Sequence, residues 1–175
     1  MAESLITVSV LYLGDDDLPA GKAKAALEKA ARGRCESRFR HITDSIIGEV
    51  ARIAAELIQP TGTWAQFDAL VLDLHFADEH DTFGGFKVLK NLLDTLRARQ
   101  TNLVPGVEEP LRDPWAELFI MSKHFDKATS PPNILKAAAA EAAKLGVPTD
   151  HCFCPAEVDK MAVLIITNAL ERHGH

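Results

Sequence analysis

The clearest indication of the fold comes from the segment Phe67-Asp-Ala-Leu-Val-Leu-Asp-Leu74. Its interior is apolar at successive positions, without the alternation that a strand with one solvated face would show. A strand buried on both faces is typical of a parallel sheet with helices packed on each side. The stretch therefore predicts a central parallel strand, and it predicts that Asp73 lies at the carboxyl end of that strand.

Apolar stretches of strand length alternate with longer stretches of helical period on either side of this segment, which is the pattern of an α/β domain. We predict strands at residues 5–13, 35–42, 67–74, 118–122 and 152–154. Helices are predicted at residues 22–31, 44–58, 83–99, 131–146 and 156–172. Residues 101–114 carry prolines and a glycine without periodicity, so we expect an inserted surface loop there. Residues 1–175 are expected to form one domain.

Composition excludes several classes of protein. The net charge of −6 argues against a nucleic-acid partner, because binding to phosphate backbones depends on clustered Lys and Arg. Apolar runs such as residues 161–166 are far shorter than the roughly 20 residues of a membrane span, so no membrane association is expected. The first residues lack the pattern of a secretion signal, which favours a cytoplasmic protein. Three cysteines favour neither a disulfide framework nor a zinc site.

Candidate functional residues lie at the predicted carboxyl ends of the strands, where ligands bind in open parallel sheets. Asp15 and Asp16 follow the first strand, Asp73 ends the third and Ser122 ends the fourth. Clustered carboxylates resist joint ionisation unless they share a cation, and hard oxygen ligands suit Mg²⁺. A carboxylate beside such a metal can accept a phosphoryl group. The competing interpretation is a solvated turn in which one aspartate caps the first helix.

This arrangement resembles the receiver domain of bacterial response regulators. The resemblance rests on the order and spacing of four segments rather than on any single motif. They are Val10-Leu-Tyr-Leu-Gly-Asp-Asp-Asp17, residues 67–74, Phe83-Gly-Gly-Phe-Lys-Val-Leu-Lys-Asn-Leu92 and Phe119-Ile-Met-Ser122. The resemblance implies a flavodoxin-like, doubly wound sheet of five parallel strands in the order 2-1-3-4-5, with helices on both faces.

The resemblance also implies roles for individual residues. Asp73 is similar to the phospho-acceptor, and Ser122 is similar to the hydroxyl that switches toward the phosphoryl group. Asp15, Asp16 and Asp73 are similar to the Mg²⁺ ligands, with His75 adding its backbone carbonyl. The implied function is a domain in two-component signal transduction or a phosphorelay, phosphorylated by a histidine kinase and acting through protein–protein contacts. An enzyme is not expected.

The chain departs from the receiver pattern in several places. Cys154 stands before Pro155 where receivers usually carry a lysine, and a thiol cannot donate the bond that an ammonium gives to a phosphoryl group. The segment after Asp73, including residues 75–81, is longer than usual, and we expect no output domain after Arg172. We therefore expect a stand-alone, divergent receiver-like domain, with a homodimer left open. The alternatives are a pseudo-receiver that binds a partner without phosphorylation and a small flavodoxin-like enzyme.

Overall fold

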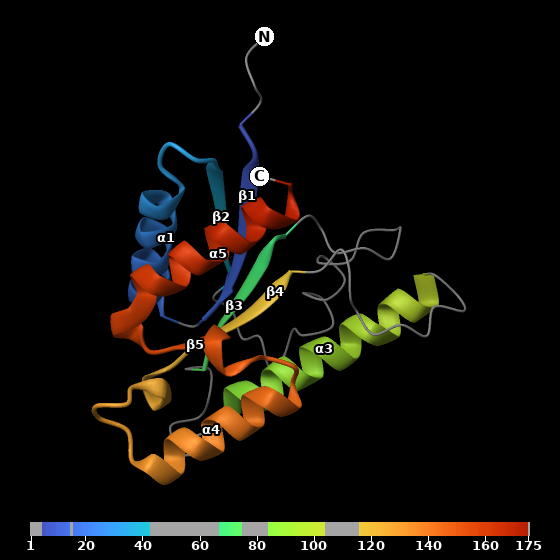
Figure 1. The fold of residues 1–175 in the computed structure, drawn as a ribbon. Helices are drawn as coiled ribbons and strands as arrows, with labels where there is room; N and C mark the ends of the chain where they lie inside the picture. Colours follow the sequence, from blue (N-terminus) through green and yellow to red (C-terminus); the bar gives the residue numbers. More distant parts are fainter. Residues whose placement is uncertain (1–4, 15, 43–66, 75–83, 104–115, 175) are drawn as a thin grey trace.

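The computed structural model describes residues 5–14, 16–42, 67–74, 84–103 and 116–174 (Figure 1). The strands are β1 (Thr7–Leu13), β2 (Glu36–Ile42), β3 (Ala69–Asp73), β4 (Glu117–Met121) and β5 (Cys152–Phe153). The α-helices are α1 (Asp17–Ala31), α3 (Gly84–Leu103), α4 (Pro132–Lys144) and α5 (Val158–Arg172). Short 3-10 turns occur at η1 (Lys123–Phe125), η2 (Thr149–His151) and η3 (Pro155–Glu157).

The strands form one sheet of five parallel strands in the order β2-β1-β3-β4-β5. This confirms the predicted α/β class and strand order. The register places Tyr12 of β1 beside His41 of β2 and beside Val71 of β3. Asp73 lies beside Met121 of β4. In Figure 1 the chain enters β1 from the top, so the carboxyl ends of the parallel strands lie toward the bottom of the picture.

Helices cover both faces of the sheet, as predicted. In Figure 1, α1 and α5 lie together on one side while α3 and α4 lie on the other. Along β1, Val8, Val10 and Tyr12 are buried with α1 and α5, whereas Leu11 and Leu13 are buried on the α3 and α4 side. Every residue of β3 is buried, which explains why its sequence shows no alternation.

Two helices are longer than their sequence patterns indicate. α1 begins at Asp17 rather than at residue 22, because Asp16 supplies a cap and Pro19 lies in the first turn, where its missing N–H is tolerated. α3 continues to Leu103, past the expected end at residue 99, and the next helix breaker in the sequence is Pro105. The helix predicted at residues 44–58 lies outside the described residues. None of the helices in the described ranges is long and apolar enough to cross a membrane.

Two glycines allow close backbone approaches at the carboxyl end of the sheet. A Cβ added at Gly85 would lie 2.8 Å from Leu74 Cα and 2.9 Å from the Leu74 carbonyl oxygen. A Cβ added at Gly14 would lie 2.7 Å from Tyr12 Cε1 and 3.1 Å from Asp73 Cβ. The start of α3 therefore packs directly on the chain that leaves β3, and the end of β1 packs against Asp73.

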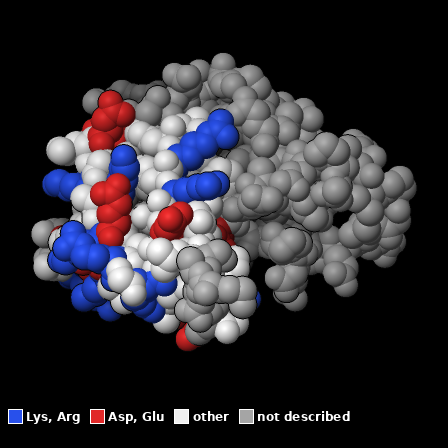
Figure 2. All heavy atoms as spheres, turned by 90° about the horizontal axis from the view of Figure 1, so that it is seen from above, with Lys and Arg blue, Asp and Glu red and all other residues white. Residues whose placement is uncertain are grey.

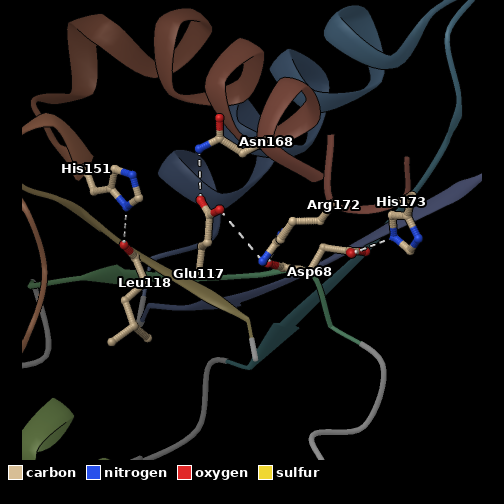
Figure 3. A network of polar contacts seen from close by, with 7 residues as sticks. All are labelled: Asp68, Glu117, Leu118, His151, Asn168, Arg172 and His173. Carbon is tan, nitrogen blue, oxygen red and sulfur yellow. Dashed lines mark hydrogen bonds and ion pairs between the residues drawn. The ribbon is translucent and has the colours of Figure 1, made fainter. Parts of the chain in front are cut away.

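A polar network fastens α5 to the opposite, amino end of the sheet (Figure 3). Arg172 Nη2 donates to the Asp68 carbonyl oxygen at 2.7 Å, and His173 Nε2 lies 2.9 Å from Asp68 Oδ1. Glu117 accepts from Asn168 at 3.0 Å and faces Arg172 at 3.7 Å. The other oxygen of Asp68 accepts the Ser9 backbone N–H at 2.8 Å. The entrances to β3 and β4 are thus joined to the last turn of α5.

We predict that Gly85→Ala lowers the free energy of unfolding by about 1–3 kcal/mol, because the new methyl group meets backbone atoms of Leu74 that cannot rotate away. Gly21→Ala is the matched control, since nothing lies within 4 Å of its added Cβ within α1. That control should raise the free energy of unfolding by about 0.5–1 kcal/mol through helix propensity. Urea unfolding of the three proteins measures both effects. Equal stability of the Gly85 variant and the wild type would contradict the close approach.

Candidate functional site

Asp73 is one of two buried polar or charged residues in the described part of the chain, and only 4% of its surface is exposed. It is the last residue of β3. The hydroxyl of Tyr12, on the neighbouring strand β1, donates a hydrogen bond to Asp73 Oδ2 at 3.0 Å. A buried carboxylate requires such donors, because transfer of an ionised group out of water is costly without them. The predicted acid therefore lies at the expected place in the sheet and has a partner that the sequence analysis did not name.

The Tyr12 ring is enclosed by aromatic side chains of β2. Its centroid lies 5.8 Å from that of Phe39 and 5.4 Å from that of His41, the latter in an edge-on arrangement. His41 Nε2 lies 2.7 Å from the Gly14 carbonyl oxygen, which makes this nitrogen the donor, and Nδ1 lies 3.6 Å from Asp17 Oδ1. Side chains from β2, β1 and β3 thus meet at the carboxyl end of the sheet.

Asp16, one of the predicted metal ligands, caps α1. Its Oδ1 accepts the Leu18 backbone N–H at 2.9 Å, and its side chain is exposed. The capping interpretation from sequence is therefore confirmed for this aspartate. Asp15 and His75, the other predicted ligands beside Asp73, lie outside the described residues. No group of three or more His, Cys, Asp or Glu side chains suited to a metal ion occurs among the residues that the structure describes.

Ser122 is the second buried polar residue in the described part of the chain, with 5% of its surface exposed. It follows β4 directly, one position beyond Met121, the register partner of Asp73. Its backbone N–H donates to the Phe153 carbonyl oxygen at 2.9 Å, and its Oγ accepts the His124 backbone N–H at 3.2 Å. The hydroxyl thus caps the η1 turn at the carboxyl edge that also holds Asp73.

Cys154 is buried directly after β5, where receivers usually carry a lysine. Its backbone N–H donates to Glu157 Oε2 at 3.2 Å, and this bond lowers the pKa of Glu157. Burial, together with the negative Glu157, raises the pKa of the Cys154 thiol. The thiol is therefore neutral at pH 7, so Cys154 supplies no positive charge to the carboxyl end of the sheet.

Sequence reasoning missed Tyr12 and His41 as parts of this site. The available signal was that Tyr12 is the one tyrosine of the chain and occurs in a strand rich in aliphatic residues. A search of protein-family models found no match to this chain, and a search of curated proteins also found none.

We predict that the thiols react slowly in the folded protein. Burial is the largest cause raising the pKa of Cys35, of Cys154 and of Cys152, the last to about 12. Since the thiolate is the reactive form, modification by a disulfide reagent at pH 8 should be at least about tenfold slower than in urea. The rate should still be rising at pH 10, where the unfolded chain has passed its ordinary thiol pKa. Equal rates in the folded and unfolded chains would contradict this assignment.

Proposed function

We propose that this chain is a divergent receiver-like signalling domain that accepts a phosphoryl group on Asp73 and acts through protein–protein contacts. The observation that carries the proposal is the place of Asp73. It is a buried carboxylate at the carboxyl end of the central strand in a parallel sheet of order β2-β1-β3-β4-β5. Open parallel sheets bind ligands at this edge. The buried hydroxyl of Ser122 after the adjacent strand β4 further supports it.

The proposed phosphoryl donor is the phosphohistidine of a histidine kinase. An oxygen of the Asp73 carboxylate attacks phosphorus, so a P–O bond forms while the P–N bond to the imidazole breaks. The leaving imidazole nitrogen keeps the electron pair of that bond and takes a proton from solvent. Asp73 becomes an acyl phosphate. Ser122 supplies a hydroxyl near this edge, which we propose reorients toward the new phosphoryl group.

The described residues supply only part of the ligand set that a Mg²⁺ ion would need at this site. Asp73 offers a carboxylate at the strand end, but the Asp16 side chain already accepts a backbone bond at the start of α1. No described group assembles three acidic or imidazole ligands. The proposal of a Mg²⁺ site therefore depends on Asp15 and His75, which lie outside the described residues.

Charge supports a protein partner rather than nucleic acid. The chain carries a formal net charge of −6. Figure 2 shows acidic and basic side chains interspersed over the described part of the face seen from above, at the amino end of the sheet. Binding to a nucleic-acid backbone uses a concentrated basic surface. The partner we propose is a histidine kinase or another signalling protein.

A pseudo-receiver is the second candidate function, and the environment of Cys154 favours it. A neutral, buried thiol replaces the ammonium that would bind a phosphoryl group after β5. In this alternative the fold is retained as a binding surface, and partner recognition does not depend on phosphorylation of Asp73.

We predict that acetyl phosphate adds one phosphoryl group to the wild type, detected by intact mass, and that hydroxylamine removes it, as expected for an acyl phosphate. Asp73→Asn should abolish the addition. Asp126→Asn is the matched control, because Asp126 is a loop aspartate whose carboxylate accepts the Ala128 backbone N–H. The control should be phosphorylated like the wild type. Absence of labelling in the wild type, or labelling that survives Asp73→Asn, would overturn the assignment.

We also predict that Cys154→Lys strengthens binding of beryllium fluoride, a phosphoryl mimic, in the presence of Mg²⁺. The new ammonium would supply a charge-assisted bond worth roughly 1–3 kcal/mol, or about five- to 150-fold in affinity. Isothermal titration of both proteins measures the change, and Cys154→Met serves as an uncharged control of similar length. Undetectable binding by the wild type and by Cys154→Lys would leave the pseudo-receiver as the surviving function.

A further inference from the structure

We propose that Tyr12 is a positioning residue that stabilises the unphosphorylated form of Asp73. The proposal rests on the function proposed above, and it assigns a regulatory part to a residue for which the resemblance to receivers implies no role. Its basis is the hydrogen bond of 3.0 Å from the Tyr12 hydroxyl to Asp73 Oδ2. Both residues are buried, and the bond joins β1 to β3 at the edge of the sheet where the phosphoryl group would be attached.

The packing around Tyr12 directs its hydroxyl toward Asp73. The ring is fully buried, and Phe39 and His41 of the neighbouring strand contact it. A Cβ at residue 14 would come within 2.7 Å of the ring atom Cε1, so the glycine there gives the ring its space. His41 is itself fixed by its bond to the Gly14 carbonyl oxygen. The hydroxyl is therefore held in place before any ligand arrives.

This placement fixes the rotation of the Asp73 carboxylate. A hydrogen bond to Oδ2 restricts rotation of the group about its Cβ–Cγ bond, so the direction of the other oxygen is also set. Positioning of a reacting group is a recognised contribution to group transfer. Tyr12 acts here through Asp73 and forms no bond to phosphorus.

The same bond is stronger before phosphoryl transfer than after it. A hydroxyl donating to an ionised carboxylate makes a charge-assisted bond, which is roughly twice as strong as a bond between neutral groups. Transfer of the phosphoryl group converts Asp73 into an acyl phosphate. The two oxygens bound to its Cγ then no longer share the full negative charge of a carboxylate. An interaction that favours one of two states shifts the equilibrium toward that state. Tyr12 therefore opposes phosphorylation to the extent that its bond weakens.

The experiment compares beryllium fluoride binding by the wild type and Tyr12→Phe in the presence of Mg²⁺. The phenylalanine keeps the buried ring and removes the hydroxyl that donates to Asp73. We expect the affinity to rise about tenfold, the ratio that corresponds to the loss of one charge-assisted bond from the unbound state alone. Thr95→Val is the control, because it deletes a hydroxyl that donates to the Asn91 carbonyl oxygen within α3. Its affinity should equal that of the wild type.

A second readout follows the hydroxyl directly. The chain has one tyrosine, so labelling tyrosine with carbon-13 at the phenolic carbon gives a single signal that reports Tyr12. This signal should move when beryllium fluoride and Mg²⁺ are added, and it should lie at a different position in Asp73→Asn. If Tyr12 had only a structural role, the signal of the wild type would not move on addition of beryllium fluoride together with a rise in the affinity of Tyr12→Phe. Urea unfolding of each variant verifies that it is folded.

The outcomes separate this proposal from the function on which it rests. Binding by the wild type with unchanged or weaker binding by Tyr12→Phe would overturn the role of Tyr12 and leave Asp73 as the phospho-acceptor. Binding by Tyr12→Phe alone would support both proposals, with the hydroxyl holding the wild type below detection. Absence of binding by both proteins would overturn the proposed function and the role of Tyr12 together.

Discussion

Burial of β3 on both faces is the constraint on which the rest of this structure depends. Both ends of such a strand are shielded from water. The polar groups there must therefore find hydrogen-bond partners within the protein. At its entrance Asp68 is bonded to β1 and to the last turn of α5, and at its exit Asp73 accepts the Tyr12 hydroxyl. The close packing at Gly14 and Gly85 belongs to the same exit. The candidate site is therefore part of how the central strand ends.

The fold could be predicted because its determinants lie within short segments. The unbroken apolar interior of residues 69–72 identifies a doubly buried strand, and the alternation of strand and helix patterns identifies a parallel sheet. The element boundaries were less accurate where competing signals overlapped. Pro19 and Gly21 indicate a loop in isolation, yet both lie in α1, because Asp16 caps the helix and Pro19 falls in its first turn.

The candidate site could be predicted only in part. Asp73 and Ser122 occupy the expected strand ends, since their positions follow from strand order alone. Both roles considered for Asp16 were compatible with its sequence, and the structure shows the capping role in the bond that Oδ1 accepts from the Leu18 N–H. Tyr12 could not be found by spacing, because its contact with Asp73 joins residues separated by 61 positions and depends on the register of two strands.

Because α5 is bonded to the amino end of the sheet, this end is suited to the attachment of a tag or linker. The described chain begins just before β1 and ends just after α5, and in Figure 1 the start of β1 and the end of α5 lie toward the top, away from the carboxyl ends of the strands. Arg172 and His173 tether the second of these points to Asp68. An affinity tag or surface linker attached at either point would lie at the end of the sheet opposite Asp73, Ser122 and Cys154. Immobilised protein is therefore suited to partner searches, because the surface is attached at the end of the sheet away from the candidate site.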